Sequence, residues 1–137
     1  MKKFEKLIIF TDGGARGNPG PAGIGAVIYD KDKNVLVEIS EYIGETTNNQ
    51  AEYKAVVAAI KKSTELGASE LDFYLDSELV VKQLKREYKV KNEGLAPLFV
   101  QVYNATLSFK KVTFTHVRRE YNKEADKLAN DAMDKMR

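Results

Sequence analysis

The sequence predicts an α/β protein built on a mixed five-stranded sheet with helices packed on its faces. Its first third alternates apolar, β-branched segments with turns, which is typical of a three-stranded antiparallel meander. The later strands are separated by helical segments, and strands connected in this way pair in parallel. A chain of 137 residues is long enough to form one domain with its own core.

Five segments are predicted to be strands because they are rich in apolar and β-branched residues. They cover about residues 6–12, 23–30, 34–43, 71–75 and 112–117. KDKN, between the second and third, is a short hairpin connection. The first and second are joined by GGARGNPGPAGIG, which holds six of the nine glycines and is expected to be a loop. It matches neither a P-loop nor a dinucleotide-binding fingerprint, since no Gly-Lys-Ser/Thr follows and it joins strand to strand.

Four segments are predicted to be helices. They cover about residues 49–66, 77–86, 95–107 and 123–136, so the predicted order is βββαβααβα. In the first, apolar residues recur at helical spacing, and Gly67 is a natural stop. The last carries an apolar stripe made of Ala125, Leu128, Ala129, Ala132 and Met136.

The composition excludes several classes of protein. The chain has no cysteine and one histidine, which rules out a disulfide scaffold, a thiolate zinc site and a multi-histidine metal site. Apolar stretches such as Val56–Ile60 are far shorter than a membrane span, and the first residues do not resemble a signal peptide. We therefore expect a cytoplasmic protein with no membrane partner. A net charge of +2 means that any nucleic-acid footprint must be local.

Two carboxylates follow strands that are expected to be parallel neighbours. Asp12 ends the most apolar strand, and Asp76 follows LDFYL. The carboxyl ends of parallel strands meet at one edge, so the two should lie side by side where ligands usually bind. Asp76 could instead cap the helix that it precedes. Gly13 and Gly14 beside Asp12 could admit a bulky ligand, or could only serve a turn.

Two further acidic residues, Glu52 and Asp126, lie near the starts of the first and last predicted helices. Taken alone, each is explained by the helix dipole or by solvation. Four carboxylates that converge repel one another and persist only if a cation neutralises them. Oxygen-only ligands favour Mg²⁺ or Mn²⁺, and a pair of such ions is the usual apparatus for phosphodiester hydrolysis.

Four segments together resemble type 1 ribonuclease H. They are TDGGARGNPGPAGIGAVI, TTNNQAEYKAV, LDSELVVKQL and EYNKEADKLA, in this order, and the resemblance spans about residues 7–132. It looks closest to the compact subgroup of archaea and some bacteria. The resemblance implies the ribonuclease H-like fold, with helices on both faces of the sheet. It also implies a two-metal endonuclease that cuts the RNA strand of an RNA–DNA hybrid and leaves 5′-phosphate and 3′-hydroxyl ends.

The resemblance also assigns residues. The family's catalytic, metal-binding carboxylates fall on Asp12, Glu52, Asp76 and Asp126. Its nucleic-acid contacts fall on the glycine segment and the TTNN segment, here Gly13, Gly14, Asn18, Thr47, Asn48 and Asn49. The whole chain, residues 1–137, is expected to be one catalytic domain, monomeric and without a separate hybrid-binding module.

The chain departs from the family pattern in three places. It has no tryptophan, and YKVKNEGL is too short for the basic protrusion of many bacterial members. Lys85, Arg86 and Lys89, with Lys82 at helical spacing, could form a reduced phosphate grip or only a solvated helix face. Glu78 stands where many members have a glutamine that donates to a base edge, which a carboxylate cannot do.

The third departure concerns the connection before the last helix. Many members carry a mobile histidine loop there, whereas this chain has only THVRREYN. His116 alternates with Val112 and Phe114 and is expected to face the packed side of the sheet. Arg118, Arg119 or Glu120 could substitute for the missing loop.

Two alternatives to a nuclease for RNA–DNA hybrids stay open. One is a non-catalytic nucleic-acid-binding relative of the same fold, and the other is a nuclease that cuts RNA duplexes.

Overall fold

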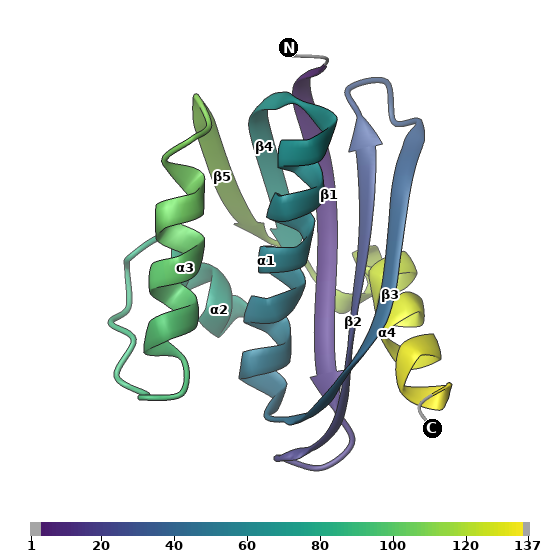
Figure 1. The fold of residues 1–137 in the computed structure, drawn as a ribbon, viewed down its shortest axis with the longest axis vertical. Coiled ribbons are helices and arrows are strands. Elements are labelled where there is room, and N and C mark those ends of the chain that lie inside the picture. Colours follow the sequence, from purple (N-terminus) through teal and green to yellow (C-terminus); the bar gives the residue numbers. More distant parts are fainter. Residues whose placement is uncertain (1–3, 136–137) are drawn as a thin grey trace.

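The computed structural model describes residues 4–135 and confirms the predicted order of elements (Figure 1). The strands are β1 (Phe4–Ala15), β2 (Gly20–Asp30), β3 (Val35–Thr46), β4 (Ala68–Leu75) and β5 (Lys111–His116). The helices are α1 (Asn48–Leu66), α2 (Glu78–Leu84), α3 (Ala96–Thr106) and α4 (Lys123–Asp134), with a short 3₁₀ helix, Arg119–Tyr121, before α4. Met136, predicted to extend the stripe of the last helix, lies outside the described residues.

The sheet is mixed, as predicted, with the strand order β3-β2-β1-β4-β5. β1 pairs antiparallel with β2, and β2 pairs antiparallel with β3. On its other side β1 pairs in parallel with β4, which pairs in parallel with β5. The first strand of the chain is therefore the central strand, and its carboxyl end lies beside that of β4.

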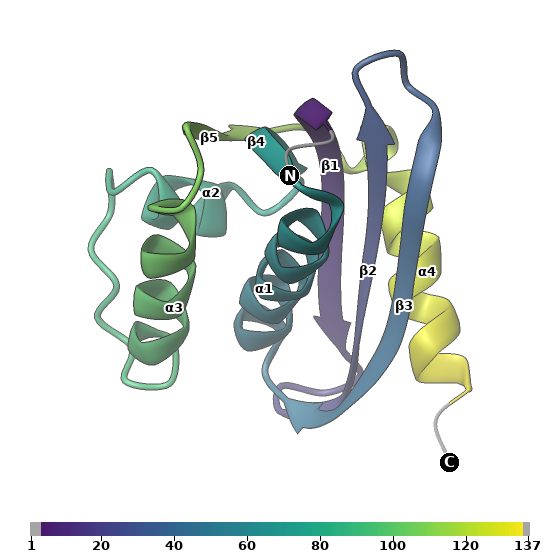
Figure 2. The ribbon, with the colours of Figure 1, turned by 45° about the horizontal axis from the view of Figure 1, so that its top comes forward.

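Helices cover the two faces of the sheet unequally. α1 and α3 lie on one face, while α4 crosses the other face behind β1, β2 and β3 (Figures 1 and 2). α2 packs against β5, α1 and α3. The main core lies between α1 and the sheet, where the largest buried side chains include Leu7, Ile9, Tyr53, Leu71 and Phe73. None of the helices in residues 4–135 is long and apolar enough to cross a bilayer.

The prediction of a long glycine loop was wrong. β1 continues to Ala15 and β2 begins at Gly20, so the connection is only residues 16–19. Of the six glycines, only Gly17 has a positive φ. Most of the others therefore serve close packing. A Cβ on Gly13 would overlap the main-chain carbonyl of Ala51 in α1, and a Cβ on Gly25 would overlap that of Ala125 in α4.

The first helix begins and ends on strong local signals. The Thr47 side chain accepts a hydrogen bond from the N–H of Gln50 at 3.2 Å, and the Gln50 side chain reaches back to the N–H of Thr47. This is a capping box, worth about 1 kcal/mol at the hydroxyl alone. Gly67 ends the helix in the left-handed conformation, φ 77°. Both signals fix where α1 starts, and with it the place of Glu52.

Replacing Gly25 with alanine is expected to destabilise the protein by about 2–3 kcal/mol, because a methyl group there meets main-chain atoms that cannot turn aside. The new Cβ would also lie 2.6 Å from the amide nitrogen of Ala129. Gly14→Ala is the matched control, since its Cβ would meet nothing closer than 3.8 Å. Urea denaturation of both variants measures the effect. Equal stability of the two variants would contradict the close approach of α4 to β2.

Candidate active site

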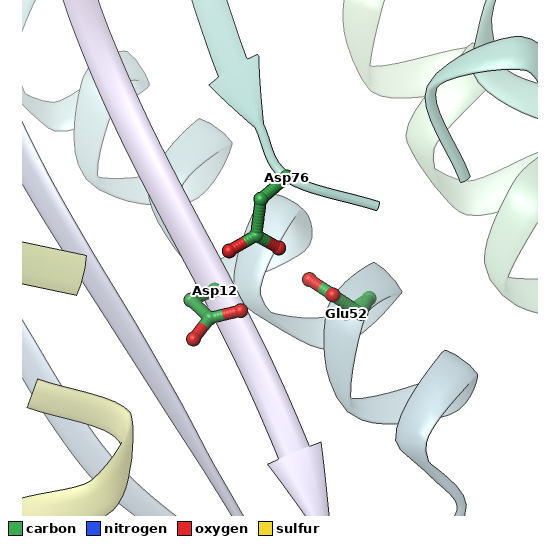
Figure 3. A group of neighbouring side chains, drawn as sticks. All are labelled: Asp12, Glu52 and Asp76. Carbon is green, nitrogen blue, oxygen red and sulfur yellow. The ribbon is translucent and has the colours of Figure 1, made fainter. Parts of the chain in front are cut away.

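Three carboxylates meet where β4 ends beside β1 (Figure 3). Asp12 lies in β1, Asp76 directly follows β4, and Glu52 lies in the first half of α1. One carboxylate oxygen from each lies within 4.8 Å of the others. Within residues 4–135 this is the one cluster of acidic or histidine side chains tight enough to hold a metal ion.

The close packing of α1 on β1 places Glu52 beside Asp12. Asp12 is paired with Gly25 across the β1–β2 ladder, and both face α4. The next residue, Gly13, faces α1, where its missing side chain lets the main chain at Ala51 approach. The Gly13 N–H lies near the Asp12 and Glu52 carboxylates and lowers the pKa of each, although burial outweighs this effect. The glycine predicted to admit a ligand therefore admits a helix instead.

Asp126 lies on the opposite side of Asp12, on α4. Its carboxyl group is in hydrogen-bond contact with that of Asp12. It does not belong to the cluster of three, but it lines the same cavity of about 460 Å³. Asn130, one turn further along α4, donates to the Asp126 carboxylate at 3.3 Å. All four predicted carboxylates therefore border one cavity.

Burial and mutual repulsion raise the pKa values of the central carboxylates. Asp12 and Glu52 are each only 8% exposed. Burial, followed by the charges of Asp76 and Asp126, raises the pKa of Asp12 to about 8. Burial and then the charges of Asp12 and Asp76 raise the pKa of Glu52 well above its usual range. The pKa of Asp76 is raised as well, mainly by burial. The fold thus holds together acidic groups whose negative charges repel one another.

Such a cluster fits divalent cations. Two carboxylates 4.8 Å apart repel by about 3–4 kcal/mol at an effective dielectric constant of ~20, before screening. One oxygen of Glu52, Oε1, is buried and receives no hydrogen bond from the described residues. Buried charges without partners are expensive, and carboxylate oxygens are the ligands that Mg²⁺ and Mn²⁺ prefer. The donor set therefore suits a hard cation.

Four of the nine predicted nucleic-acid contacts line the cavity, and the others lie outside its lining. Gly13, Gly14, Asn48 and Asn49 line it. Asn48 Oδ1 accepts a hydrogen bond from the N–H of Ala15 at 2.7 Å, and Asn18 Oδ1 accepts one from the N–H of Asn48 at 3.0 Å. Two predicted contact residues therefore brace the β1–β2 connection against the start of α1.

The predicted helical row of basic residues is wrong in part. α2 ends at Leu84, and Arg86 has a positive φ of 64°, so Lys89 is not on the same helix. The Lys82 and Lys85 ammonium groups pair with the carboxylates of Glu78 and Glu87 at 3.4 and 3.3 Å. The Arg86 guanidinium lies 5.4 Å from the centre of the Tyr103 ring. The short helix ends here because the chain must turn toward α3.

The structure corrects the prediction for His116 and selects among its neighbours. His116 is exposed, because the packed face of β5 ends before it. Of the candidates after β5, Arg119 lines the cavity, and its charge lowers the pKa values of Glu52 and Asp76. The sequence does not single out Asn122, because an asparagine directly before a helix is an ordinary capping residue. It does not single out Asn130 either, because a polar residue inside an amphipathic helix is usually solvent-exposed.

Comparisons with known proteins agree with this geometry. The family model described as "Reverse transcriptase-like" matches residues 10–132. The chain is 32% identical to "Ribonuclease H" of Prosthecochloris aestuarii, over 94% of this chain and 96% of that protein. It is 45% identical to "Bifunctional protein Rv2228c" of Mycobacterium tuberculosis, but spans only 36% of that relative.

The fold of a solved relative is nearly the same. LC11-RNase H1, whose structure was determined in complex with an RNA/DNA hybrid, superimposes with a TM-score of 0.90 at 46% identity. The match covers 94% of this chain and 97% of that one. Strands and helices of this chain therefore correspond to those of a protein that holds such a hybrid.

The metal-free protein is expected to lose stability as the pH rises from about 4 to about 8. In that range the folded Asp12 holds a proton that the unfolded chain releases, because its pKa is raised from 3.8 to about 8. Asp12→Asn should therefore be more stable than the unaltered protein at pH 9, by about 1–3 kcal/mol, with the difference fading toward pH 4. Denaturation in EDTA across this range measures the effect.

The same two proteins should respond differently to metal. A cation that binds only the folded site raises the melting temperature by mass action, so Mg²⁺ should stabilise the unaltered protein and have little effect on Asp12→Asn. A variant that is less stable without metal, yet is stabilised by Mg²⁺ as strongly as the unaltered protein, would show that Asp12 is a structural residue.

Proposed function

Because this chain belongs to the ribonuclease H family, we propose that it is a metal-dependent endonuclease that hydrolyses the RNA strand of RNA–DNA hybrids. The observation that carries the proposal is the convergence of Asp12, Glu52 and Asp76 at one sheet edge, beside Asp126. Relatives that the chain covers almost completely are named ribonuclease H. The products would carry 5′-phosphate and 3′-hydroxyl ends. A monomeric state and a cytoplasmic location stay predictions from the sequence.

The four carboxylates would hold two divalent cations, Mg²⁺ or Mn²⁺. When bound, such ions supply an activated water and stabilise the charge on the departing 3′ oxygen. Asp12, the central residue, contacts groups on both sides and is the natural shared ligand. Asp126 borders only one side of the cluster. Asn130 would hold the Asp126 carboxylate in place through its 3.3 Å hydrogen bond.

Asn18, Asn48 and Asn49 would bind the nucleic-acid backbone. The Oδ1 atoms of Asn18 and Asn48 are used within the protein, which orients the two amide groups. Their Nδ2 groups take no part in those bonds and can donate to phosphate or sugar oxygens. The Thr47 hydroxyl is engaged in capping α1, so we assign Thr47 to holding this segment in place rather than to direct contact.

Arg119 would take the place of the missing histidine loop. It is the cation among residues 118–120 that lines the cavity, and its charge favours the ionised forms of Glu52 and Asp76. A guanidinium is always charged and can pair with a phosphate through two parallel hydrogen bonds. Arg119 would thus help to seat the substrate phosphate next to the carboxylates.

Asp12→Asn is expected to reduce hybrid cleavage by ~10³-fold or more, because it removes the ligand common to both ions. Asp126→Asn should be milder, since Asp126 lies outside the cluster of three. Labelled hybrid, RNA duplex and DNA duplex, each incubated with Mg²⁺ or Mn²⁺, test both the activity and its substrate.

Asp72→Asn is the matched control for these variants. Asp72 is an equally short acid on β4, but it pairs with Lys6 at 3.0 Å and lies away from the cavity. Its loss should leave cleavage within a few-fold of the unaltered protein. Activity of Asp12→Asn within about tenfold of that level would remove the assignment, and preferred cleavage of RNA duplex would change the proposed substrate.

Replacing Lys85, Arg86 and Lys89 together with glutamine should weaken hybrid binding and flatten its dependence on salt. Each lost phosphate contact lowers the slope of log affinity against log salt by about 0.7–0.9. Lys31 lies in the turn after β2, and Lys61 and Lys62 lie in the second half of α1, all outside the cavity lining. Replacing these three removes the same charge and should leave the slope unchanged. Affinity is measured with Ca²⁺ in place of Mg²⁺. Equal slopes for both triple variants would mean that the first three residues are only solvated.

A further inference from the structure

On the basis of the proposed metal-dependent activity, we infer that Asn122 is a positioning residue that fixes the carboxylates relative to one another and so sets the affinity of the site for divalent cations. Asn122 is 1% exposed and stands directly before α4. It lies beside three segments that carry carboxylates. Its side chain does not make the helix-capping hydrogen bond that its position before α4 predicts.

An asparagine directly before the first residue of a helix ordinarily caps that helix. Its side-chain oxygen accepts a hydrogen bond from an N–H in the first turn, which contributes about 1 kcal/mol. Asn122 makes no such bond. Its Nδ2 group instead donates to the main-chain oxygen of Thr11 at 2.9 Å, across 111 residues of sequence. The amide is therefore diverted from its own helix to the central strand, at the residue before Asp12.

The same residue also contacts the segments of Asp126 and Asp76. The main-chain oxygen of Asn122 accepts the N–H of Asp126 at 3.1 Å, which begins the first turn of α4. Its side chain also lies near the Asp76 carboxylate, close enough to lower the pKa of that group. One buried asparagine thus links the main chain next to Asp12, the helix that carries Asp126, and the Asp76 side chain.

Asp76 needs such a partner because no strand pairing holds it. The β1–β4 ladder ends at Tyr74, and the β4–β5 ladder ends at Leu75. Asp76 lies beyond both, where its side chain could turn toward solvent. Hydrogen bonds to a carboxylate from a buried neutral donor restrict its orientation and favour its ionised form. Partners of this kind typically change metal affinity 10–100-fold when they are removed.

The alternative is that Asn122 only tethers α4 to the sheet. A second tether provides the control, because the Ser40 hydroxyl of β3 donates to the main-chain oxygen of Leu128 in α4 at 2.6 Å. Ser40→Ala removes a bond between α4 and the sheet without touching a carboxylate. Asn122→Leu and Asn122→Ala both remove the amide, but they differ in size and should differ in stability.

The test compares these variants by Mg²⁺ titration. The rise in melting temperature and the rate of hybrid cleavage are followed as Mg²⁺ is added. The Mg²⁺ concentration that gives half of the rise in melting temperature, or half of the cleavage rate, should be about tenfold or more higher in both Asn122 variants than in the unaltered protein. The factor should be similar for the two variants. At saturating Mg²⁺ the KM for hybrid should change less than twofold, because Asn122 does not line the substrate cavity. Ser40→Ala should leave the Mg²⁺ dependence unchanged.

Three results would overturn the inference. One is an unaltered Mg²⁺ requirement in both Asn122 variants, with only the metal-free melting temperature lowered. A second is a rise in the Mg²⁺ requirement that increases with the loss of stability, so that it is larger in the less stable Asn122 variant and is also present in Ser40→Ala. The melting titration needs no substrate, so it decides the role of Asn122 even if the unaltered protein cleaves no hybrid. A protein whose melting does not respond to Mg²⁺ would also refute the inference.

Discussion

The site depends on the close approach of two helices to the end of the central sheet. α1 comes so near to β1 that only glycine fits at position 13, and α4 comes so near to β2 that only glycine fits at position 25. These two contacts lie on opposite faces of the sheet. Asp12 belongs to both, because it precedes Gly13 in β1 and pairs with Gly25 of β2. Glu52 and Asp126 reach Asp12 because main chain, rather than side chains, forms the contact.

This packing forces acidic groups together at a cost that the rest of the fold must offset. The buried apolar core between α1 and the sheet, with Leu7, Ile9, Tyr53 and Phe73 fully covered, provides the opposing stability. The raised pKa values of Asp12, Glu52 and Asp76 are the local signature of that conflict. Strained electrostatics of this kind gather at functional sites because the same groups bind a cation or substrate strongly.

The supports of the site are mostly neutral amides. Asn48 and Asn18 brace the β1–β2 connection, Asn130 donates to Asp126, and Asn122 donates to the main chain of Thr11 beside Asp12. An amide donates and accepts without adding charge, so it can orient a carboxylate without neutralising it. Charged partners would compete with a cation for the same oxygens. Two arginines line the cavity: Arg16 is paired with Asp134 at 2.6 Å, and the charge of Arg119 lowers the pKa of Glu52.

The sequence by itself determined the order of the elements and the mixed sheet, and its resemblance to a known family assigned the four carboxylates as metal ligands. Periodicity and turn residues are local properties, and the end of β4 before Asp76 follows from them, whereas β1 continues past Asp12 to Ala15. Only tertiary packing decided that most of the glycine segment forms strands, because a glycine in a loop and a glycine beneath a closely packed helix look alike in sequence. The same holds for the end of α2 at Leu84, for exposed His116, and for Asn122. Its amide points to the sheet because residues 111 positions away lie beside it, and no local pattern records such a distance.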